Sequence, residues 1–299
     1  MDQPINQFIA TFNNNVSLYI KRDDLLHPFI SGNKLRKLKY NLQHVKENNF
    51  TTIVTFGGAF SNHIAATAFA GFKNNIKTVG IIRGDELEKN YSNNPTLAFA
   101  EKHGMTFEFV SRTNYLQRAE ISFLATLQNK YPNSFILPEG GSNQLAIKGC
   151  EEILTQTDQN FDHICCSIGT STTIQGIINS SFANQKIVAF PALKGIDFKK
   201  ILDINCNKKN FEICTEYHFG GYAKVNSDLI CFINNFKNEY QIPLDPVYTG
   251  KMMFGIIDKI KNNYFAPNSK ILAIHTGGLQ GIAGMNQFLA KQNKTTINV

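Results

Sequence analysis

Seven short apolar segments recur along this chain, and most of them close on small residues such as Gly or Ser. They cover residues 52–56, 78–82, 105–110, 134–137, 163–167, 187–190 and 271–275. Segments of helical length separate them, and such alternation is typical of mostly parallel sheets covered by helices. Because the runs are continuously apolar, we expect strands that are buried on both faces. The fold class predicted is therefore α/β.

Ligands of such folds bind at the carboxyl ends of the strands, where loops lead into helices. Three loops of this kind are rich in Gly, Ser, Thr or Asn, at residues 57–62, 139–143 and 167–173. The amides and hydroxyls of the loop at 167–173 suit a phosphate at a helix N-terminus. The loop lacks the Gly-Lys-Ser/Thr ending of a P-loop, so it does not predict a nucleotide site of that kind.

Composition and charge exclude several classes of protein. The formal net charge is +7, but the lysines are scattered, so we expect no nucleic-acid partner and instead a basic surface that attracts an anionic cofactor or substrate. No apolar run approaches the roughly 18–20 residues of a membrane span, and no signal peptide is visible, so a cytoplasmic enzyme without membrane contact is expected. The six cysteines lack metal-ligand spacing, which predicts buried thiols and no metal site.

An amphipathic helix is predicted over residues 34–47, with Asn33 or Ser31 as its N-cap. Its buried stripe consists of apolar residues at spacings of three, four and three, namely Leu35, Leu38, Leu42 and Val45. At about 100° per residue, Lys34 lies on the shoulder of this stripe, whereas Arg36 points away from it.

Lys34 therefore lies in a poor place for a stable ammonium. Burial beside the stripe and the positive end of the helix dipole both favour the free amine, which is the form that condenses with an aldehyde. The alternative is a lysine whose stem covers the edge of the core while its amine reaches water. Lys37 lies one turn further along the same side of the helix.

Four motifs, in this order, resemble one enzyme family. They are Lys21-Arg22-Asp23-Asp24 with Gly32-Asn33-Lys34-Leu35-Arg36-Lys37-Leu38, Gly57-Gly58 with Ser61-Asn62-His63, Pro138-Glu139-Gly140-Gly141-Ser142-Asn143, and Leu244-Asp245-Pro246-Val247-Tyr248-Thr249-Gly250-Lys251. Together they resemble the 1-aminocyclopropane-1-carboxylate deaminase / D-cysteine desulfhydrase family, which belongs to the tryptophan-synthase-β-like enzymes that use pyridoxal 5′-phosphate (PLP). The resemblance extends from residue 21 to about residue 280.

The resemblance implies roles for individual residues. Lys34 would hold PLP as a Schiff base and shuttle the Cα proton of the substrate, and Asn62 would hydrogen-bond the 3′-oxygen of the cofactor. Ser61 would bind the substrate carboxylate or assist proton transfer. The phosphate would be held by Lys37 together with the loop residues Gly169, Thr170, Ser171 and Thr172.

Further side chains would line the substrate. Tyr222 and Tyr248 match two active-site tyrosines of the family and would bind or protonate the leaving group, unless they pack as core aromatics. His63 is a candidate for the substrate site by its position, with a structural role at the helix start as the alternative. His275 ends a strand and has the same structural alternative.

Two threonines indicate the branch of the family. The deaminases have Glu after the second tyrosine and Leu after the histidine of the last strand, where this chain has Thr249 and Thr276. A hydroxyl partner leaves the pyridine nitrogen of PLP neutral, which still serves β-elimination of a good leaving group. The resemblance thus implies a PLP-dependent lyase that converts D-cysteine and water to pyruvate, hydrogen sulfide and ammonia. Thr276 would contact the cofactor and Thr249 the substrate.

The resemblance also implies an architecture of two doubly wound, mostly parallel domains with the cofactor between them. Residues 1–38 and 148–299 would form a large PLP-binding domain, residues 39–147 a small inserted domain, and the chain a homodimer. Two alternative functions stay open. One is a 1-aminocyclopropane-1-carboxylate deaminase that gives 2-oxobutyrate and ammonia, and the other is a catalytically silent PLP- or anion-binding protein.

Overall fold

The computed structural model describes residues 4–30 and 32–298 and contains two compact units. Unit 1 comprises Met1–Asn33 and Cys150–Val299, and unit 2 comprises Lys34–Gly149. Two helices pass from one unit into the other, namely α1 (Asn33–Glu47) and α6 (Gln144–Cys150). The domain boundaries predicted after residues 38 and 147 fall inside these helices, and the assignment of PLP binding to the larger domain stays a prediction.

Unit 1 contains a six-stranded sheet in the order β1-β2-β10-β7-β8-β9. Its strands are β1 (Asn6–Thr11), β2 (Ser17–Lys21), β7 (His163–Ile168), β8 (Lys186–Pro191), β9 (Phe211–Ile213) and β10 (Lys270–Ile274). Only the hairpin of β1 and β2 is antiparallel, and all other neighbours pair in parallel. The carboxyl ends of β7, β8 and β10 therefore lie along one edge of this sheet.

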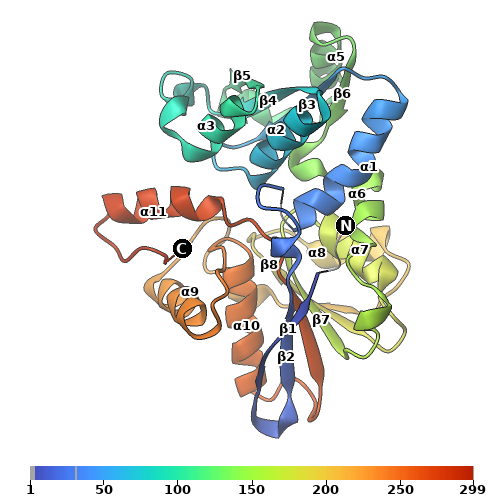
Figure 1. Cartoon of the computed structure of the whole chain (residues 1–299), viewed down its shortest axis with the longest axis vertical. Coiled ribbons are helices and arrows are strands. Elements are labelled where there is room, and N and C mark those ends of the chain that lie inside the picture. The colour runs from blue at the N-terminus through green and yellow to red at the C-terminus, as the bar shows by residue number, and fades with distance from the viewer. Residues whose placement is uncertain (1–3, 31, 299) are drawn as a thin grey trace. The chain divides into compact units, whose positions relative to one another are not determined.

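Helices cover both faces of this sheet. They are α7 (Thr172–Ser180), α8 (Phe198–Asn205), α9 (Ser227–Tyr240), α10 (Thr249–Lys261) and α11 (Gly281–Lys291). Adjacent cysteines of β7 mark the two faces: Cys165 packs in an apolar cluster with α9, α10 and α11, and Cys166 in a second cluster with α7 and α8. Figure 1 shows α9 and α10 on the opposite side of the strands from α7. The expected burial of these strands on both faces is confirmed.

Unit 2 contains a four-stranded parallel sheet in the order β5-β4-β3-β6. Its strands are β3 (Thr52–Gly57), β4 (Lys77–Arg83), β5 (Met105–Val110) and β6 (Ser134–Leu137), and its other helices are α2 (Asn62–Asn74), α3 (Pro95–Lys102), α4 (Arg112–Leu116) and α5 (Ile121–Lys130). Ile81 packs in a cluster with residues of α4 and α5, and its neighbour Ile82 in a cluster with residues of α2 and α3. This sheet is therefore also covered on both faces.

The α/β class with mostly parallel sheets is confirmed, and the seven predicted strands correspond to β3–β8 and β10. Three strands were missed. The edge strands β1 and β9 are largely half-buried or exposed, so their sequences lack a continuous apolar run, and β2 joins the sheet through its hairpin with β1. None of the helices within 4–30 and 32–298 has both the length and the apolar character that a membrane span needs.

The predicted stripe of α1 is only partly correct. Leu38 and Val45 are buried, whereas Leu35 and Leu42 are only half-buried. Arg36, which was placed away from the stripe, is itself buried. Helix α6 packs closely against this part of α1, because a Cβ at Gly149 would lie 2.0 Å from the Arg36 carbonyl oxygen. The predicted cap Ser31 lies outside the described residues.

Candidate functional site

The start of α2 collects two of the predicted site residues of unit 2. Strand β3 ends at Gly57, and the loop that follows leads to Ser61, which is the N-cap of α2 and accepts a hydrogen bond from the Ile64 amide at 3.3 Å. Asn62 follows, and its Oδ1 atom is buried without a hydrogen-bond partner among the described residues. Buried polar atoms are normally paired, so this amide lacks a ligand. By turning about its last bond it can offer N–H or C=O, which fits the 3′-oxygen of PLP.

Two lysines and a histidine lie close together in the same unit. Lys34 is half-buried in the first turn of α1, and Lys37 is fully buried and donates to the Gly140 carbonyl oxygen at 3.1 Å. Burial lowers the pKa of His63 well below its usual value, and the charges of Lys34 and Lys37 lower that pKa further. His63 is therefore neutral at pH 7.

Hydrogen bonds also fix the tautomer of His63. The Thr55 hydroxyl donates to the Leu137 carbonyl oxygen at 2.8 Å, so it has only acceptor capacity left for His63 Nε2, which lies 2.8 Å away. The proton of the ring is consequently on Nε2, and Nδ1 is an acceptor. These contacts give His63 a structural role between β3 and β6, and its predicted contact with substrate stays a prediction.

In unit 1, the loop after β7 brings a predicted phosphate site against a predicted tyrosine. A Cβ at Gly169 would lie 2.9 Å from Cε1 of Tyr248, so a larger residue here would force the tyrosine ring to shift. Ser171 has a φ of 57° and is the N-cap of α7 without a side-chain cap bond. The first-turn amides of such a helix have no intrahelical acceptor. The loop therefore fits a phosphate, as the resemblance implies for Gly169, Thr170, Ser171 and Thr172.

The residue before Lys34 is tied to the same part of unit 1. Asn33 Nδ2 donates to Thr173 Oγ1 at 3.0 Å in the first turn of α7, and the Asn33 amide donates to the Thr276 carbonyl oxygen at 3.2 Å. A Cβ at Gly32, whose φ is 58°, would overlap the Thr276 carbonyl at 2.0 Å. The Asn33 side chain thus bonds α7 instead of capping α1, and the Gly-Asn-Lys motif fixes the backbone just before Lys34.

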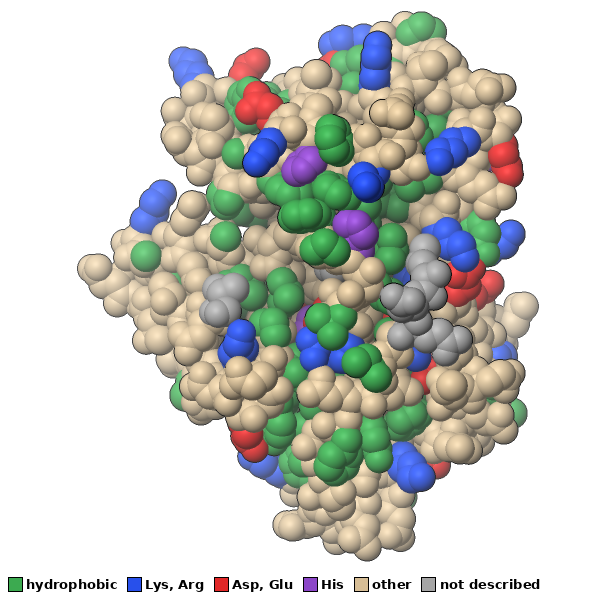
Figure 2. Space-filling view, in the orientation of Figure 1, with side chains coloured by type: hydrophobic (Ala, Val, Ile, Leu, Met, Phe, Trp, Pro, Cys, Tyr) green, Lys and Arg blue, Asp and Glu red, His purple; other side chains and the backbone are tan. Residues whose placement is uncertain are grey.

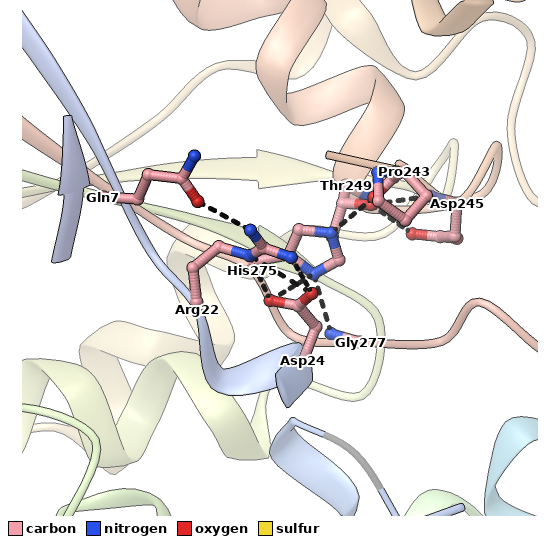
Figure 3. Close-up of polar contacts among 8 residues, drawn as sticks. All are labelled: Gln7, Arg22, Asp24, Pro243, Asp245, Thr249, His275 and Gly277. Atoms are coloured by element: carbon pink, nitrogen blue, oxygen red, sulfur yellow. Dashed lines mark hydrogen bonds and ion pairs between the residues drawn. The ribbon is translucent and has the colours of Figure 1, made fainter. Parts of the chain in front are cut away.

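The segment that carries Tyr248 and Thr249 is closed by one carboxylate. Asp245 accepts hydrogen bonds from the amides of Val247, Tyr248 and Thr249 and from the Thr249 hydroxyl, at 2.7–2.9 Å. Figure 3 shows the contacts between Asp245 and Thr249. The same hydroxyl accepts from the Asp245 amide at 2.9 Å. Burial raises the pKa of Asp245, and these hydrogen bonds oppose that rise. Thr249 is fully buried, so its predicted substrate contact stays a prediction.

A second buried cluster supports Thr276. Arg22 forms an ion pair with Asp24 at 2.8 Å, and the Nδ1 atom of His275 lies 3.7 Å from the same carboxylate (Figure 3). His275 Nδ1 accepts from the Gly277 amide at 3.2 Å, so its proton is on Nε2 and donates to the Pro243 carbonyl oxygen at 2.8 Å. His275 therefore packs and pairs at the end of β10, next to Thr276.

The two predicted tyrosines lie together. The rings of Tyr222 and Tyr248 are 6.3 Å apart at an angle of 65°, and Tyr222 is half exposed. Sequence reasoning quoted Lys251 and Asp245 in the same motif but gave them no role. The signal that could have found them is their charge within an otherwise apolar stretch.

In the described part of the chain, the distribution of charged side chains points to no metal site. Lys and Arg side chains are spread over the face drawn in Figure 2. Within residues 4–30 and 32–298, no group of three or more His, Cys, Asp or Glu side chains could hold a metal ion.

Known proteins resemble this chain over most of its length. The family model described as "Pyridoxal-phosphate dependent enzyme" matches residues 4–277. A Thermotoga maritima protein named "Putative 1-aminocyclopropane-1-carboxylate deaminase" is 30% identical, covering 91% of this chain and 92% of that protein. An Arabidopsis thaliana protein named "Bifunctional D-cysteine desulfhydrase/1-aminocyclopropane-1-carboxylate deaminase, mitochondrial" is 30% identical, covering 90% of this chain and 74% of that protein.

A solved structure shares the arrangement of the chain. It is described as an "ACC deaminase homologue" and superposes with a TM-score of 0.79 and 25% sequence identity. The match covers 94% of this chain and 91% of the other. The similarity covers most of both units, so it supports a common fold for this chain.

Proposed function

Because this chain belongs to the pyridoxal-phosphate dependent enzyme family, we propose that it catalyses β-elimination from a small D-amino acid, with D-cysteine as its substrate. Its cofactor is PLP. The reaction converts D-cysteine and water to pyruvate, hydrogen sulfide and ammonia. When bound, PLP draws electrons from the substrate Cα and makes its proton easier to remove.

Lys34 is the residue that we propose holds the cofactor and moves the Cα proton. Its place in the first turn of α1 opposes a positive charge on its amine, because the N-terminal end of a helix is positive. The buried ammonium of Lys37, one turn away, opposes it as well. A neutral amine is the form that can bond a carbonyl carbon and accept a proton.

The remaining roles follow the position of each residue. Ser61 binds the substrate carboxylate or assists proton transfer, and His63 contributes to the same subsite. Asn62 bonds the 3′-oxygen of PLP, for which its unpaired Oδ1 atom is the support. The phosphate is bound by the loop 169–172 with Lys37, and Thr276 contacts the cofactor.

Tyr222 and Tyr248 act on the leaving group in this proposal. Their rings are in contact distance of each other, and the Tyr248 ring lies against Gly169. A phenol can donate a proton or a hydrogen bond to the thiolate that leaves Cβ. Removal of one hydroxyl should therefore lower kcat more than it changes the binding of PLP.

The observation that carries the choice of substrate is the buried, uncharged pair of threonines. Thr249 and Thr276 are both buried. The Thr249 hydroxyl donates a hydrogen bond to the Asp245 carboxylate and accepts one from the Asp245 amide. Neither position offers a carboxylate that would keep the pyridine nitrogen charged. A weaker electron sink suits loss of hydrosulfide better than opening of a cyclopropane ring.

The test has two parts. The purified protein should be yellow with PLP, Lys34→Ala should lose the visible absorption band, and the matched variant Lys46→Ala, an exposed lysine of the same helix, should keep it. A panel of D-cysteine, L-cysteine, β-chloro-D-alanine and 1-aminocyclopropane-1-carboxylate should give pyruvate from the D-amino acids. A visible band that survives Lys34→Ala would reject Lys34 as the anchor.

A second function is favoured by the names of several relatives, which are named as putative 1-aminocyclopropane-1-carboxylate deaminases. Formation of 2-oxobutyrate from the cyclopropane substrate, without pyruvate from D-cysteine, would establish that function and reject the desulfhydrase. A yellow protein that yields no keto acid from any substrate would reject both.

We also propose that the chain forms a homodimer. Light scattering should then give twice the chain mass of 33.6 kDa.

A further inference from the structure

The loop that carries Tyr222 has an unusual backbone. Four of the five residues from 219 to 223 have positive φ, namely Phe219 (53°), Gly220 (94°), Gly221 (116°) and Ala223 (55°). Side chains larger than hydrogen disfavour this region by about 1–2 kcal/mol per residue. Such a conformation persists only where surrounding contacts hold it. Something outside the loop must therefore stabilise the backbone next to Tyr222.

The loop consists of two consecutive turns. The Gly221 amide donates to the His218 carbonyl oxygen at 3.0 Å and closes the first turn. The Lys224 amide donates to the Gly221 carbonyl oxygen at 3.2 Å and closes the second. Tyr222 is the second residue of the second turn, so the direction of its side chain depends on how both turns are held.

Lys251 binds the two carbonyl groups that close these turns. From the first turn of α10, its Nζ atom donates to the His218 carbonyl oxygen at 2.9 Å and to the Gly221 carbonyl oxygen at 2.7 Å. The side chain is buried, and each carbonyl oxygen thereby accepts one bond from the loop and one from Lys251. One ammonium thus joins both turns to a regular helix.

The surroundings of Lys251 are poor in negative charge. Burial lowers its pKa to about 8, against an opposing effect of Asp245 in the same motif. Lys194 lies beside Gly221, and Lys224 beside Gly220. The His218 ring accepts from the Gly220 amide at 2.9 Å. No carboxylate within 4–30 and 32–298 forms an ion pair with Lys251, so its hydrogen-bond acceptors are the carbonyls of the turns.

The same short segment also holds the second tyrosine, because Asp245 binds the amides of residues 247–249. We infer that Lys251 is a positioning residue that locks the two turns and so fixes Tyr222 against Tyr248. The inference rests on the proposed role of these tyrosines in the reaction. Lys251 itself contacts neither substrate nor cofactor in this assignment.

Hydrogen exchange measures the lock directly in the PLP-loaded protein. Lys251→Met keeps the length of the side chain and removes its donors, and amides of residues 218–224 should then exchange at least about tenfold faster at pH 7. The matched control is Lys259→Met, a buried lysine of the same helix whose partner is Glu216 at 3.2 Å. Equal protection of 218–224 in both variants would overturn the inference.

If Lys251→Met does not fold, the wild-type protein still provides the test. Between pH 7 and pH 9, exchange of residues 218–224 should rise relative to a peptide from α9, after correction for intrinsic rates, because a neutral amine makes weaker hydrogen bonds than an ammonium. A constant ratio over this range would contradict the lock.

Kinetics separate positioning from general damage. Lys251→Met should lower kcat about tenfold with little change in KM, and it should cause no further loss in a Tyr222→Phe background, because both changes remove the same contribution. Losses that multiply in the double variant would overturn the inference. A wild-type kcat for Tyr222→Phe alone would reject the proposed role of Tyr222, while the exchange measurement would still decide about Lys251.

Discussion

Two lysines of unit 1 are equally buried but have opposite surroundings. Lys21 is 1% exposed and Lys251 is 2% exposed. Lys21 Nζ lies 2.7 and 3.0 Å from the two carboxylate oxygens of Asp158, whereas Lys251 donates to two backbone carbonyls. Lys21 and its counterion connect distant parts of the fold. Lys251 instead holds the turns at residues 218–224 through their carbonyl oxygens, and its pKa is lowered to about 8.

The surroundings of Lys21 form a complete set of hydrogen bonds. Asp158 also accepts from Asn6 Nδ2 at 2.7 Å and from the Thr155 amide at 2.8 Å. The pair connects β2 to a turn that is 137 residues away in the sequence. Because the charges and lone pairs are all matched, the cost of burying the ions is largely offset.

The largest expected effect comes from making Lys21 resemble Lys251. Asp158→Asn removes the charge but keeps oxygen and nitrogen atoms at the same places, so Lys21 becomes a buried cation without a counterion. We expect the free energy of unfolding to fall by about 3–5 kcal/mol, measured by urea denaturation at pH 7.

Two further variants test the reason for this loss. Lys21→Met combined with Asp158→Asn should recover part of it, because the unpaired charge is removed together with its partner. Lys186→Ala breaks an exposed pair with Glu212 and should cost at most about 1 kcal/mol. Equal losses for the buried and the exposed pair would mean that burial does not distinguish them.

The sequence predicted the parts of the molecule that depend on local pattern. Interior strands such as β7 and β3 were found because both of their faces are apolar, and the start of α2 was found because Ser61 is a good cap. The edge strands β1 and β9 lack this pattern. β1 is placed by its hairpin with β2 and β9 by its pairing with β8, and no continuous apolar run marks either edge strand.

The sequence offers candidates for the site residues, which stay predictions, but it does not show their contacts. Motifs pointed to Lys34 and Tyr248, and the resemblance to Tyr222, yet nothing local shows that Lys251 would bond carbonyls 30 and 33 residues earlier in the chain. In the same way, the hydroxyl of Thr249 looked free for a ligand and is instead bonded by Asp245. Such pairings are decided by packing, and the direction of a buried side chain follows from them.

His63 extends the comparison to unit 2, because it too is buried without an opposite charge. Its pKa is lowered by burial, Lys34 and Lys37, so below about pH 6.5 the unfolded chain binds a proton that the folded chain does not. Stability should therefore fall as the pH drops, by up to about 2 kcal/mol between pH 6.5 and pH 5. His63→Gln, whose amide can donate to Thr55, should lack this part of the pH dependence in urea denaturation.

A pH dependence that is the same in His63→Gln and in the wild-type protein would mean that the histidine is protonated in the folded state. The charges of Lys34 and Lys37 would then not keep the ring neutral. His63 would in that case keep its proton in the folded protein, as an ion-paired group such as Lys21 does.

The smallest expected effect concerns Lys251 at alkaline pH. Its pKa is lowered to about 8, so above pH 8 the unfolded chain keeps a proton that the folded chain has lost, and a higher pH favours the folded state. Relative to Lys251→Met, the wild-type protein should gain at most about 1.4 kcal/mol from pH 8 to pH 9 in urea denaturation. Over the same range the turns at 218–224 should exchange faster. General loosening of the fold would move both quantities in the same direction, whereas release of one buried ammonium from two carbonyl groups moves them in opposite directions.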